Sequence, residues 1–144
     1  IPTIISQILA GSRHVRLGAL APTRDFSFVS DTVTAFIGMM GNDATVGRIV
    51  NVGSGFEISI GETAQMVADI IGTPINIEND ERRLRPPDSE VERLLADISL
   101  ARELMGWRPA YGGREGFRRG LAETIEWFRN PDNLSRYKAD HYAL

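Results

Sequence analysis

The sequence predicts an α/β fold whose parallel sheet is incomplete. Short segments rich in β-branched residues alternate with longer segments of helical periodicity, which is typical of a sheet covered by helices. No internal repeat, low-complexity segment or linker interrupts this alternation. Only about four short strands are visible, which is few for a complete doubly wound domain. We therefore expect the sheet to lack some of its strands.

The chain is predicted to begin with a helix that is followed by two strands. Isoleucines recur at helical spacing over residues 1–9, and Gly11 stands where a left-handed residue would end that helix. A short strand is expected around residues 15–17. After the loop that holds Pro22, aromatic and polar residues alternate over residues 26–29, which predicts a second strand.

Asp31 is placed to cap a second helix. The apolar stripe of that helix consists of Val33, Phe36, Ile37 and Met40. Residues 48–52 predict a further strand, which the turn Gly53-Ser54-Gly55 follows. We expect this strand to belong to a larger parallel sheet and to leave an exposed edge in the chain.

Ser59 and Glu62 form the S-x-x-E capping-box pattern at the start of a third helix, which runs to about Ile71 and is closed by Gly72. A short strand is predicted at residues 75–77. Two more helices follow, at residues 99–105 and in the segment whose apolar face is Phe117, Leu121, Ile125 and Phe128.

The composition excludes several classes of function. The net charge of −3 has interspersed signs, which argues against a nucleic-acid or anionic-membrane partner. No apolar run is long enough to span a bilayer. The chain has no cysteine, so disulfides and thiolate metal sites are excluded, and a reducing, cytoplasmic compartment is expected. His14 and His141 are isolated, so no metal site is expected.

Two segments each hold an arginine beside a restrained backbone. Arg24 lies between a proline-containing loop and a strand, and Arg85 precedes Pro86-Pro87, which restricts it to extended conformations. Guanidinium groups bind two phosphate oxygens at once, so two arginines can neutralise a diphosphate. Glu90 lies nearby in the sequence, and its carboxylate can accept hydrogen bonds from sugar hydroxyls. This combination suggests a nucleotide-sugar site.

Each of these residues also has an ordinary structural explanation. Arg24 could pair with its neighbour Asp25, and Glu90 could be a solvated carboxylate. The other charges that could balance one another are Arg82, Arg83, Arg85, Glu78, Asp80 and Glu81. The residues alone leave both interpretations open.

The turn Gly53-Ser54-Gly55 invites comparison with a dinucleotide-binding loop. Ile58 occupies the place of the third glycine, and no acidic residue ends a second strand at the required distance. We interpret the segment as a strand-to-helix turn and not as a cofactor fingerprint.

Four segments, taken in order, carry a resemblance to a known family. They are Pro2-Thr3-Ile4-Ile5; residues 23–32; Asn51-Val52-Gly53-Ser54-Gly55 with Ser59; and Arg85-Pro86 through Ser89-Glu90-Val91, continuing to Leu95-Ala96-Asp97 and residues 104–109. With them the chain resembles the C-terminal portion of an extended short-chain dehydrogenase/reductase of the NAD-dependent epimerase/dehydratase family. The resemblance implies the substrate-binding part of an extended Rossmann-type fold, without its N-terminal NAD(P)-binding domain.

Within that family, Arg85-Pro86 and Ser89-Glu90-Val91 are similar to nucleotide-sugar 4,6-dehydratases of the UDP-N-acetylhexosamine and GDP-mannose types. The extra Pro87-Asp88 favours the first type, and Ala19 stands where GDP-mannose enzymes usually have asparagine. The resemblance assigns Arg24 and Arg85 to the diphosphate, Glu90 to a ribose or sugar hydroxyl, and the strand backbone near Leu17 to the base.

The family's catalytic Tyr-x-x-x-Lys pair and glycine-rich cofactor loop are not found in these residues, so no catalytic residue is assigned. We expect a nucleotide-sugar-binding portion of a 4,6-dehydratase, inert by itself, whose NAD or NADP is bound mainly by the missing half. The alternatives are a nucleotide-sugar epimerase and a non-catalytic split subunit or interaction module. The chain starts at Ile1, without methionine, which suggests truncation or processing. We expect it to form a homo-oligomer or to associate with its own N-terminal half.

Overall fold

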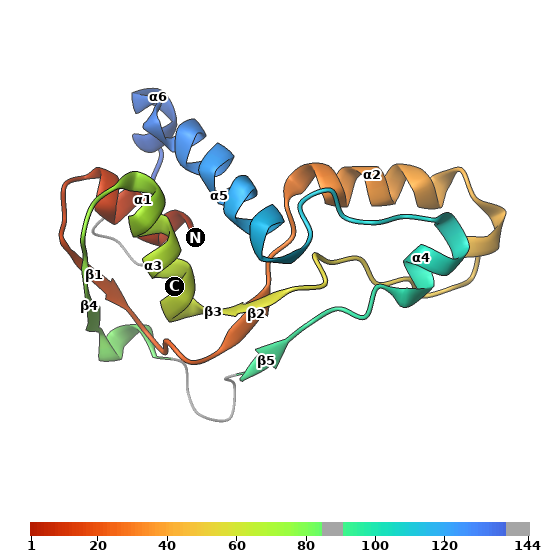
Figure 1. Cartoon of the computed structure of the whole chain (residues 1–144), viewed down its shortest axis with the longest axis horizontal. Helices are drawn as coiled ribbons and strands as arrows, with labels where there is room; N and C mark the ends of the chain where they lie inside the picture. Colours follow the sequence, from red (N-terminus) through yellow and green to blue (C-terminus); the bar gives the residue numbers. More distant parts are fainter. Residues whose placement is uncertain (85–90, 138–144) are drawn as a thin grey trace. The chain divides into compact units, whose positions relative to one another are not determined.

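The structure is a computed structural model that describes residues 1–84 and 91–137. Helices and short parallel strands alternate along the chain, which confirms the predicted α/β class (Figure 1). The chain divides into two compact units. The first contains Ile1–Pro22, Ser59–Glu92 and Leu121–Leu144, and the second contains Thr23–Ile58 and Arg93–Gly120.

The first unit is built on two parallel strands. β1 (His14–Leu17) pairs with β4 (Asn76–Asn79) in a register that sets His14 opposite Asn76. Helix α1 (Pro2–Leu9) packs against β1 and against α3 (Ile60–Ile71). The apolar core of this unit consists of Ile4, Ile5, Ile8, Val15, Leu17, Ala64, Met66, Val67, Ala68, Leu121, Ile125 and Phe128.

Local signals in the sequence correctly predicted this unit. The Ser59 hydroxyl accepts from the Glu62 amide at 3.1 Å, and the Glu62 carboxylate accepts from the Ser59 amide at 3.2 Å, which is the predicted capping box. Gly72 ends α3 at φ 80°, and Gly11 follows α1 at φ 88°. Such short-range pairs need no knowledge of the tertiary fold, so they can be found in the sequence.

The second unit contains a three-stranded sheet in the order β3-β2-β5. The strands are β3 (Glu57–Ser59), β2 (Thr23–Asp25) and β5 (Arg93–Leu94), and β2 is parallel to β5. The helices of this unit are α2 (Val29–Met40), α4 (Ser99–Met105) and the first part of α5 (Gly113–Arg129). The remaining elements of the chain are the 3₁₀ turns η1 (Asp43–Thr45) and η2 (Glu81–Arg83) and the short helix α6 (Pro131–Leu134).

The strand predicted at residues 26–29 is wrong, because β2 ends at Asp25 and α2 already begins at Val29. The alternation that suggested a strand reflects aromatic packing. The ring of Phe26 stacks on Phe117 of α5 with centroids 5.6 Å apart, and that of Phe28 stacks on Tyr111 at 4.1 Å. Two aromatic residues that anchor a connecting segment thus imitate strand periodicity.

Asp31 does not cap α2, although the sequence predicted that it would. The N-cap is Phe28, and Asp31 lies in the first turn of the helix, where it is buried. Its carboxylate accepts hydrogen bonds from the amides of Ala110 and Tyr111, both at 2.9 Å. Its role is therefore to hold the segment before α5 against α2.

Residues 48–52 do not form a strand in this chain, contrary to the prediction. The structure assigns them no strand, and in the part of the chain that it describes residues 49–52 make no backbone hydrogen bond. A strand forms only beside a partner, because its backbone groups are satisfied by the neighbouring strands of the sheet. The prediction of a larger sheet around this segment remains a prediction.

None of the helices in the described ranges 1–84 and 91–137 combines the length and apolarity needed to cross a membrane.

Candidate functional site

Arg24 lies in the middle of β2, opposite Leu94 of β5, and is partly buried. Its guanidinium Nη1 donates to the carbonyl of Thr23 at 2.7 Å. The strand pairing fixes the backbone of Arg24, so its side chain leaves the sheet in a defined direction. The predicted restraint on Arg24 is therefore present, although it comes from β2 and β5 and not from a strand at residues 26–29.

A charged cluster supports the backbone next to Arg24. The Thr23 hydroxyl donates to Glu57 at 2.7 Å, and Glu57 also accepts from Arg93 at 2.5 Å. These hydrogen bonds, chiefly those from Arg93, hold the pKa of Glu57 below its ordinary value. Because the three residues come from β2, β3 and β5, the cluster ties all three strands together.

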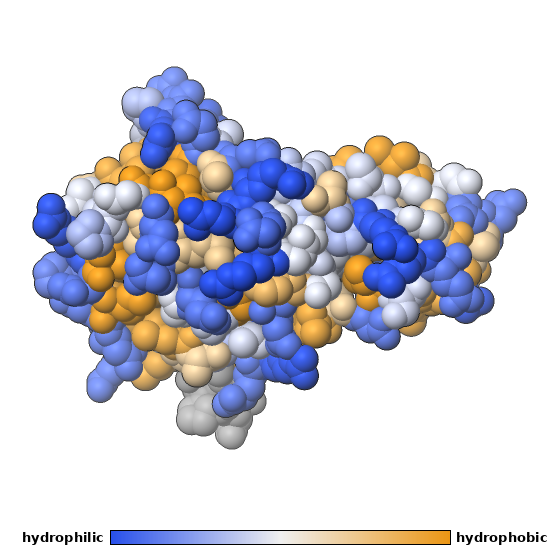
Figure 2. All heavy atoms as spheres, viewed as in Figure 1, coloured by the Kyte–Doolittle hydropathy of each residue, from blue (hydrophilic) through white to orange (hydrophobic). Residues whose placement is uncertain are grey.

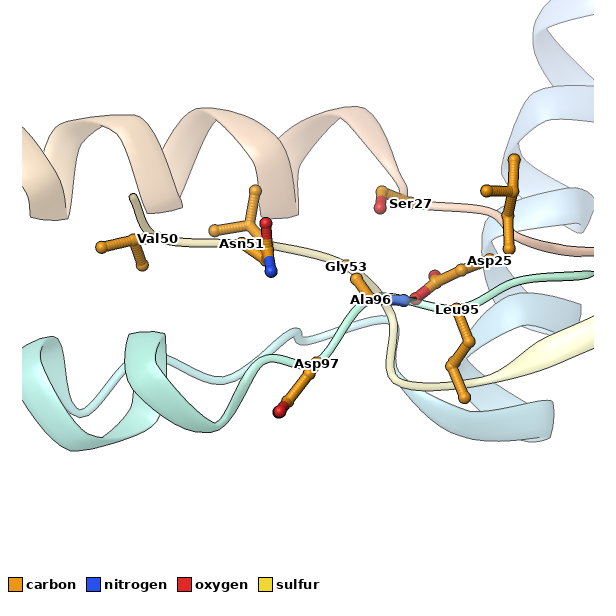
Figure 3. Close-up of a pocket in the computed structure, with 10 residues that line it drawn as sticks. Asp25, Ser27, Val50, Asn51, Gly53, Leu95, Ala96 and Asp97 are labelled. Carbon is orange, nitrogen blue, oxygen red and sulfur yellow. Dashed lines mark hydrogen bonds between the residues drawn. The ribbon is translucent and has the colours of Figure 1, made fainter. Parts of the chain in front are cut away.

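Asp25 joins three segments of the second unit. Its Oδ1 accepts from the amide of Ser54 at 2.7 Å and from the Ser54 hydroxyl at 2.5 Å. Its Oδ2 accepts from the amides of Gly55 and Ala96, both at 3.3 Å. In Figure 3 the Asp25 carboxylate lies beside Ala96 and Gly53. The sequence reasoning considered Asp25 only as an ion-pair partner of Arg24 and missed this role.

Gly53 has a reason to be glycine that is unrelated to cofactor binding. A Cβ at this position would lie 2.6 Å from both the Cβ of Ala96 and the Oδ2 of Asp25. No side chain fits there, so the glycine permits close packing between the turn and the segment that follows β5. The glycine pair in the sequence signals this close approach.

The turn Gly53-Ser54-Gly55 does not fit the diphosphate of a dinucleotide. The amides of Ser54 and Gly55, which would have to face phosphate oxygens, already donate to Asp25. Backbone amides arranged in this way bind anions, and here the anion is a carboxylate of the chain itself. The interpretation of the turn as structural agrees with these contacts, and we assign no step of a reaction to a cofactor bound at it.

A cavity of about 480 Å³ adjoins Asp25 (Figure 3). It is lined by residues 50–53 on one side and by residues 94–97 on the other, with Asp25 and Ser27 between them. Asp97 accepts hydrogen bonds from Ser99, and these lower the pKa of the Asp97 carboxyl. The lining thus mixes apolar side chains with the polar residues Asp25, Ser27, Asn51 and Asp97.

Leu17, the predicted base contact, lies at the end of β1 in the first unit and is buried. Its carbonyl accepts from the amide of Asp80 at 2.7 Å. That carbonyl is therefore already engaged within the chain. The assignment of the backbone near Leu17 to a nucleotide base remains a prediction.

Arg82 and Arg83, which closely precede Arg85 in the sequence, pair with an acidic neighbour of the chain, as the alternative to a ligand role described above. Arg82 donates to Asp80 at 3.0 Å and Arg83 donates to it at 3.2 Å. Hydrogen bonds from these arginines, led by Arg82, lower the pKa of Asp80 to about 2. Arg83 also lies with its carbonyl against Gly18, where a side chain would collide. Arg82 and Arg83 thus stabilise the 3₁₀ turn η2, in which both lie, through their hydrogen bonds to Asp80.

Arg85 and Glu90, the other two predicted ligands, lie outside the described residues. Arg24 belongs to the second unit and Leu17 to the first. All four assignments therefore remain predictions. His14 was expected to be isolated, but its Nδ1 lies 2.6 Å from Glu78, a contact that sequence spacing did not reveal. Within residues 1–84 and 91–137 no cluster of side chains could hold a metal ion.

Comparisons with known proteins point to one family. The family model described as GDP-mannose 4,6 dehydratase matches residues 1–120. A UDP-glucose 4-epimerase of Mycolicibacterium smegmatis is 36% identical over 129 residues, which cover 88% of this chain and 38% of the epimerase. A UDP-N-acetyl-alpha-D-glucosaminuronate decarboxylase of Bacillus cytotoxicus is 31% identical over 135 residues, covering 92% of this chain and 40% of the decarboxylase.

A solved structure supports the same relationship. The structure of MoeE5 in complex with UDP-glucuronic acid and NAD is similar with a TM-score of 0.73 and 29% identity, covering 88% of this chain and 40% of MoeE5. The chain thus spans 38% to 40% of the length of these three proteins.

Proposed function

The chain belongs to the GDP-mannose 4,6-dehydratase family, which groups it with NAD-dependent epimerases and dehydratases of nucleotide sugars, and from this premise we propose that it is the nucleotide-sugar-binding portion of an NAD(P)-dependent 4,6-dehydratase. The matched residues 1–120 include both arginine segments and Glu90. In this proposal the chain is the C-terminal portion of a longer enzyme and supplies no catalytic residue.

The observation that carries the proposal is the placement of Arg24. The residue is held by β2 and is followed directly by Asp25, whose carboxylate binds three amides and one hydroxyl. Because the backbone of Arg24 is already fixed, its guanidinium can bind a phosphate with little further loss of backbone conformational entropy. Its forked donors match two phosphate oxygens.

The other assigned ligands extend this site. Arg85 would share the diphosphate with Arg24, since two cations neutralise its charge better than one. Glu90 would accept hydrogen bonds from a ribose or sugar hydroxyl, and the backbone near Leu17 would contact the base. The family-model match favours these roles because it spans all four positions.

The cofactor would be bound mainly by the portion of the enzyme outside this chain. Asp25 engages the amides of the glycine-rich turn Gly53-Ser54-Gly55, which supports that assignment. NAD or NADP would supply hydride exchange with the sugar when bound. The isolated chain is then expected to bind substrate weakly or not at all and to catalyse nothing.

A nucleotide-sugar 4-epimerase is the second candidate. It is favoured by the 36% identity to the Mycolicibacterium smegmatis UDP-glucose 4-epimerase over 88% of the chain. The two candidates share the substrate class and the arginine site and differ only in the product, so the residues described above serve either.

Product analysis distinguishes them. The complete polypeptide encoded with this chain would be incubated with NAD or NADP and, separately, with UDP-N-acetylglucosamine, UDP-glucose and GDP-mannose. A product that has lost one water molecule, detected by mass spectrometry, supports the dehydratase. A product of unchanged mass but altered chromatographic mobility supports the epimerase. If none of the three sugars is converted with either cofactor, both candidates are wrong.

A further inference from the structure

Thr23 connects the guanidinium of Arg24 to an ion pair on the neighbouring strands. Arg24 Nη1 donates to the carbonyl of Thr23 at 2.7 Å. The hydroxyl of the same Thr23 donates to Oε2 of Glu57, also at 2.7 Å, and Arg93 Nε donates to that Oε2 at 2.8 Å. These contacts form one series of hydrogen bonds that ends at the Arg24 guanidinium. We call Thr23, Glu57 and Arg93 the Thr23 relay.

The ion pair at the far end of the Thr23 relay has a defined geometry. Arg93 Nε lies 2.7 Å from Oε1 of Glu57 and 2.8 Å from Oε2, and both oxygens are therefore engaged. The Arg93 side chain is 67% exposed and that of Glu57 is 24% exposed. Figure 2 shows strongly hydrophilic surface where Figure 1 draws β5. Exposed ion pairs contribute little to global stability, so the effect of this one is chiefly local.

The strands around Arg24 are short, so side-chain contacts add substantially to their pairing. β2 and β3 have three residues each and β5 has two, whereas strands in globular proteins usually have about five or six. The register of β2 and β5 sets Thr23 opposite Arg93. The contacts with Glu57 of β3 then link all three strands at this position, which directly precedes Arg24.

The Thr23 relay acts on Arg24 from the other face of the sheet. Successive side chains along a strand point to opposite faces, which separates the side chains of Thr23 and Arg24. Glu57 accepts from the Thr23 hydroxyl and from Arg93, so the ion pair belongs to the Thr23 face. Its influence on a ligand of Arg24 therefore passes through Thr23 and not through direct contact.

We propose that the Thr23 relay positions the guanidinium of Arg24 for the diphosphate of a nucleotide sugar and thereby sets the affinity for that ligand. The relay holds Thr23, and the Thr23 carbonyl holds Arg24 Nη1. A ligating side chain that is already ordered loses less conformational entropy on binding, so it binds more tightly. The inference rests on the proposed function in taking Arg24 as a diphosphate ligand.

Substitution of Thr23 tests the relay without changing the charge of the site. Thr23→Val removes the hydroxyl that donates to Glu57 and keeps the branched shape and strand propensity, whereas Thr23→Ser keeps the hydroxyl. Calorimetric titration of the complete encoded polypeptide with UDP-N-acetylglucosamine measures the affinity. We expect Thr23→Val to weaken binding about fivefold and Thr23→Ser to stay within about twofold of the unsubstituted protein. Unchanged affinity in Thr23→Val would overturn the proposal.

A double-mutant cycle shows whether the effect passes through Arg24. In Arg24→Ala the relay has no guanidinium to position, so adding Thr23→Val should weaken binding by less than about twofold more. The cycle also separates this inference from the proposed function. If Arg24→Ala alone leaves the affinity unchanged, the diphosphate assignment fails and the inference fails with it. If Arg24→Ala weakens binding and the effect of Thr23→Val adds to it in full, only the inference fails.

Arg93→Met tests the far end of the relay, with Arg129→Met as its control. Arg129 forms an exposed ion pair with Glu126 at 3.4 Å on α5, outside the relay. We expect Arg93→Met to weaken binding about fivefold and Arg129→Met to leave it unchanged. Circular dichroism checks folding, because unfolding alone would weaken binding fivefold only if about four fifths of the protein were unfolded. Unchanged affinity in folded Arg93→Met would overturn the proposal, and if this variant does not fold, the Thr23 variants decide.

Discussion

The carboxylate of Asp25 and Ser54 are joined by two hydrogen bonds, of 2.7 Å from the Ser54 amide and 2.5 Å from its hydroxyl. Because of this pair, the amides of a turn with two glycines, which resembles a phosphate loop in sequence, are engaged by a carboxylate of the chain itself. The carboxylate already occupies the position where the amides converge. The same pair fixes the backbone directly after Arg24, the residue proposed to bind the diphosphate.

Replacing Asp25 by asparagine should destabilise the chain. The asparagine side chain has the same shape, but one of its two polar atoms is a donor and would face amides that are donors themselves. Because hydrogen bonds to a charged group contribute about 1.5–3 kcal/mol, we expect Asp25→Asn to lower the free energy of unfolding by about that amount. Urea denaturation followed by circular dichroism measures this.

The control for Asp25→Asn is Asp69→Asn, an exposed position on α3 whose side chain accepts from Gln65. That substitution should change the unfolding free energy by less than about 0.5 kcal/mol. Equal effects of the two substitutions would show that Asp25 does not join the three segments as described.

Gly53→Ala should destabilise the chain, whereas Gly41→Ala should not. The added methyl group at position 53 would lie 2.6 Å from two atoms, while that at position 41 would have its nearest neighbour at 3.8 Å. Gly41 has φ −95°, which alanine adopts readily. We expect a loss of about 1–3 kcal/mol for Gly53→Ala and a change near zero, or a gain of up to about 1 kcal/mol, for Gly41→Ala.

The matched pair of glycine variants is compared by thermal unfolding under one buffer condition. A Gly53→Ala variant as stable as the Gly41→Ala variant would mean that the turn does not pack closely against Ala96 and Asp25.

Asp80 should make the stability of the chain fall at acidic pH. Its pKa is about 2 in the folded chain, below the ordinary value of 3.8, because Arg82 and Arg83 donate to it. The contribution is therefore present in full above about pH 3.8 and is lost as the pH falls toward about 2. In Asp80→Asn the loss of stability across this interval should be smaller.

Denaturant titrations at several values between about pH 5 and pH 2 would follow this change, with the exposed Asp43→Asn as control. Parallel stability curves for the unsubstituted chain and Asp80→Asn would contradict the assigned ion pairs.

The sequence predicted those parts of the structure that depend on neighbours in the chain. The capping box at Ser59 and Glu62 and the glycine after α1 rest on contacts within a few residues, and both are present. A restraint on Arg24 was also predicted, but from a strand at residues 26–29, whereas Arg24 lies within β2 itself.

The features that the sequence did not reveal depend on distant partners. Asp31 was predicted to be a cap because helix starts favour aspartate, but its acceptor role toward Ala110 and Tyr111 involves residues about 80 positions away. The role of Asp25 and the cluster of Thr23, Glu57 and Arg93 are of the same kind. Sequence spacing carries no signal for such contacts, since the same residue types are also common on a solvated surface.

The strand expected at residues 48–52 shows a third case. The strand propensity of these residues can be recognised in the sequence. A strand also requires a pairing partner, and the described part of the chain offers none. Propensity and pairing are separate conditions, and only the first is local.

The nucleotide-diphosphate assignment of Arg24 and Arg85 is the central claim, and calorimetric titration of the complete polypeptide with UDP-N-acetylglucosamine tests it most directly. Three variants are compared with the unsubstituted protein: Arg24→Ala, Arg85→Ala and the control Arg118→Ala, an exposed arginine on α5. Charge-assisted hydrogen bonds contribute about 1.5–3 kcal/mol each, so each of the first two substitutions should weaken binding about tenfold or more. Arg118→Ala should bind like the unsubstituted protein. Unchanged affinity in both Arg24→Ala and Arg85→Ala would contradict the account.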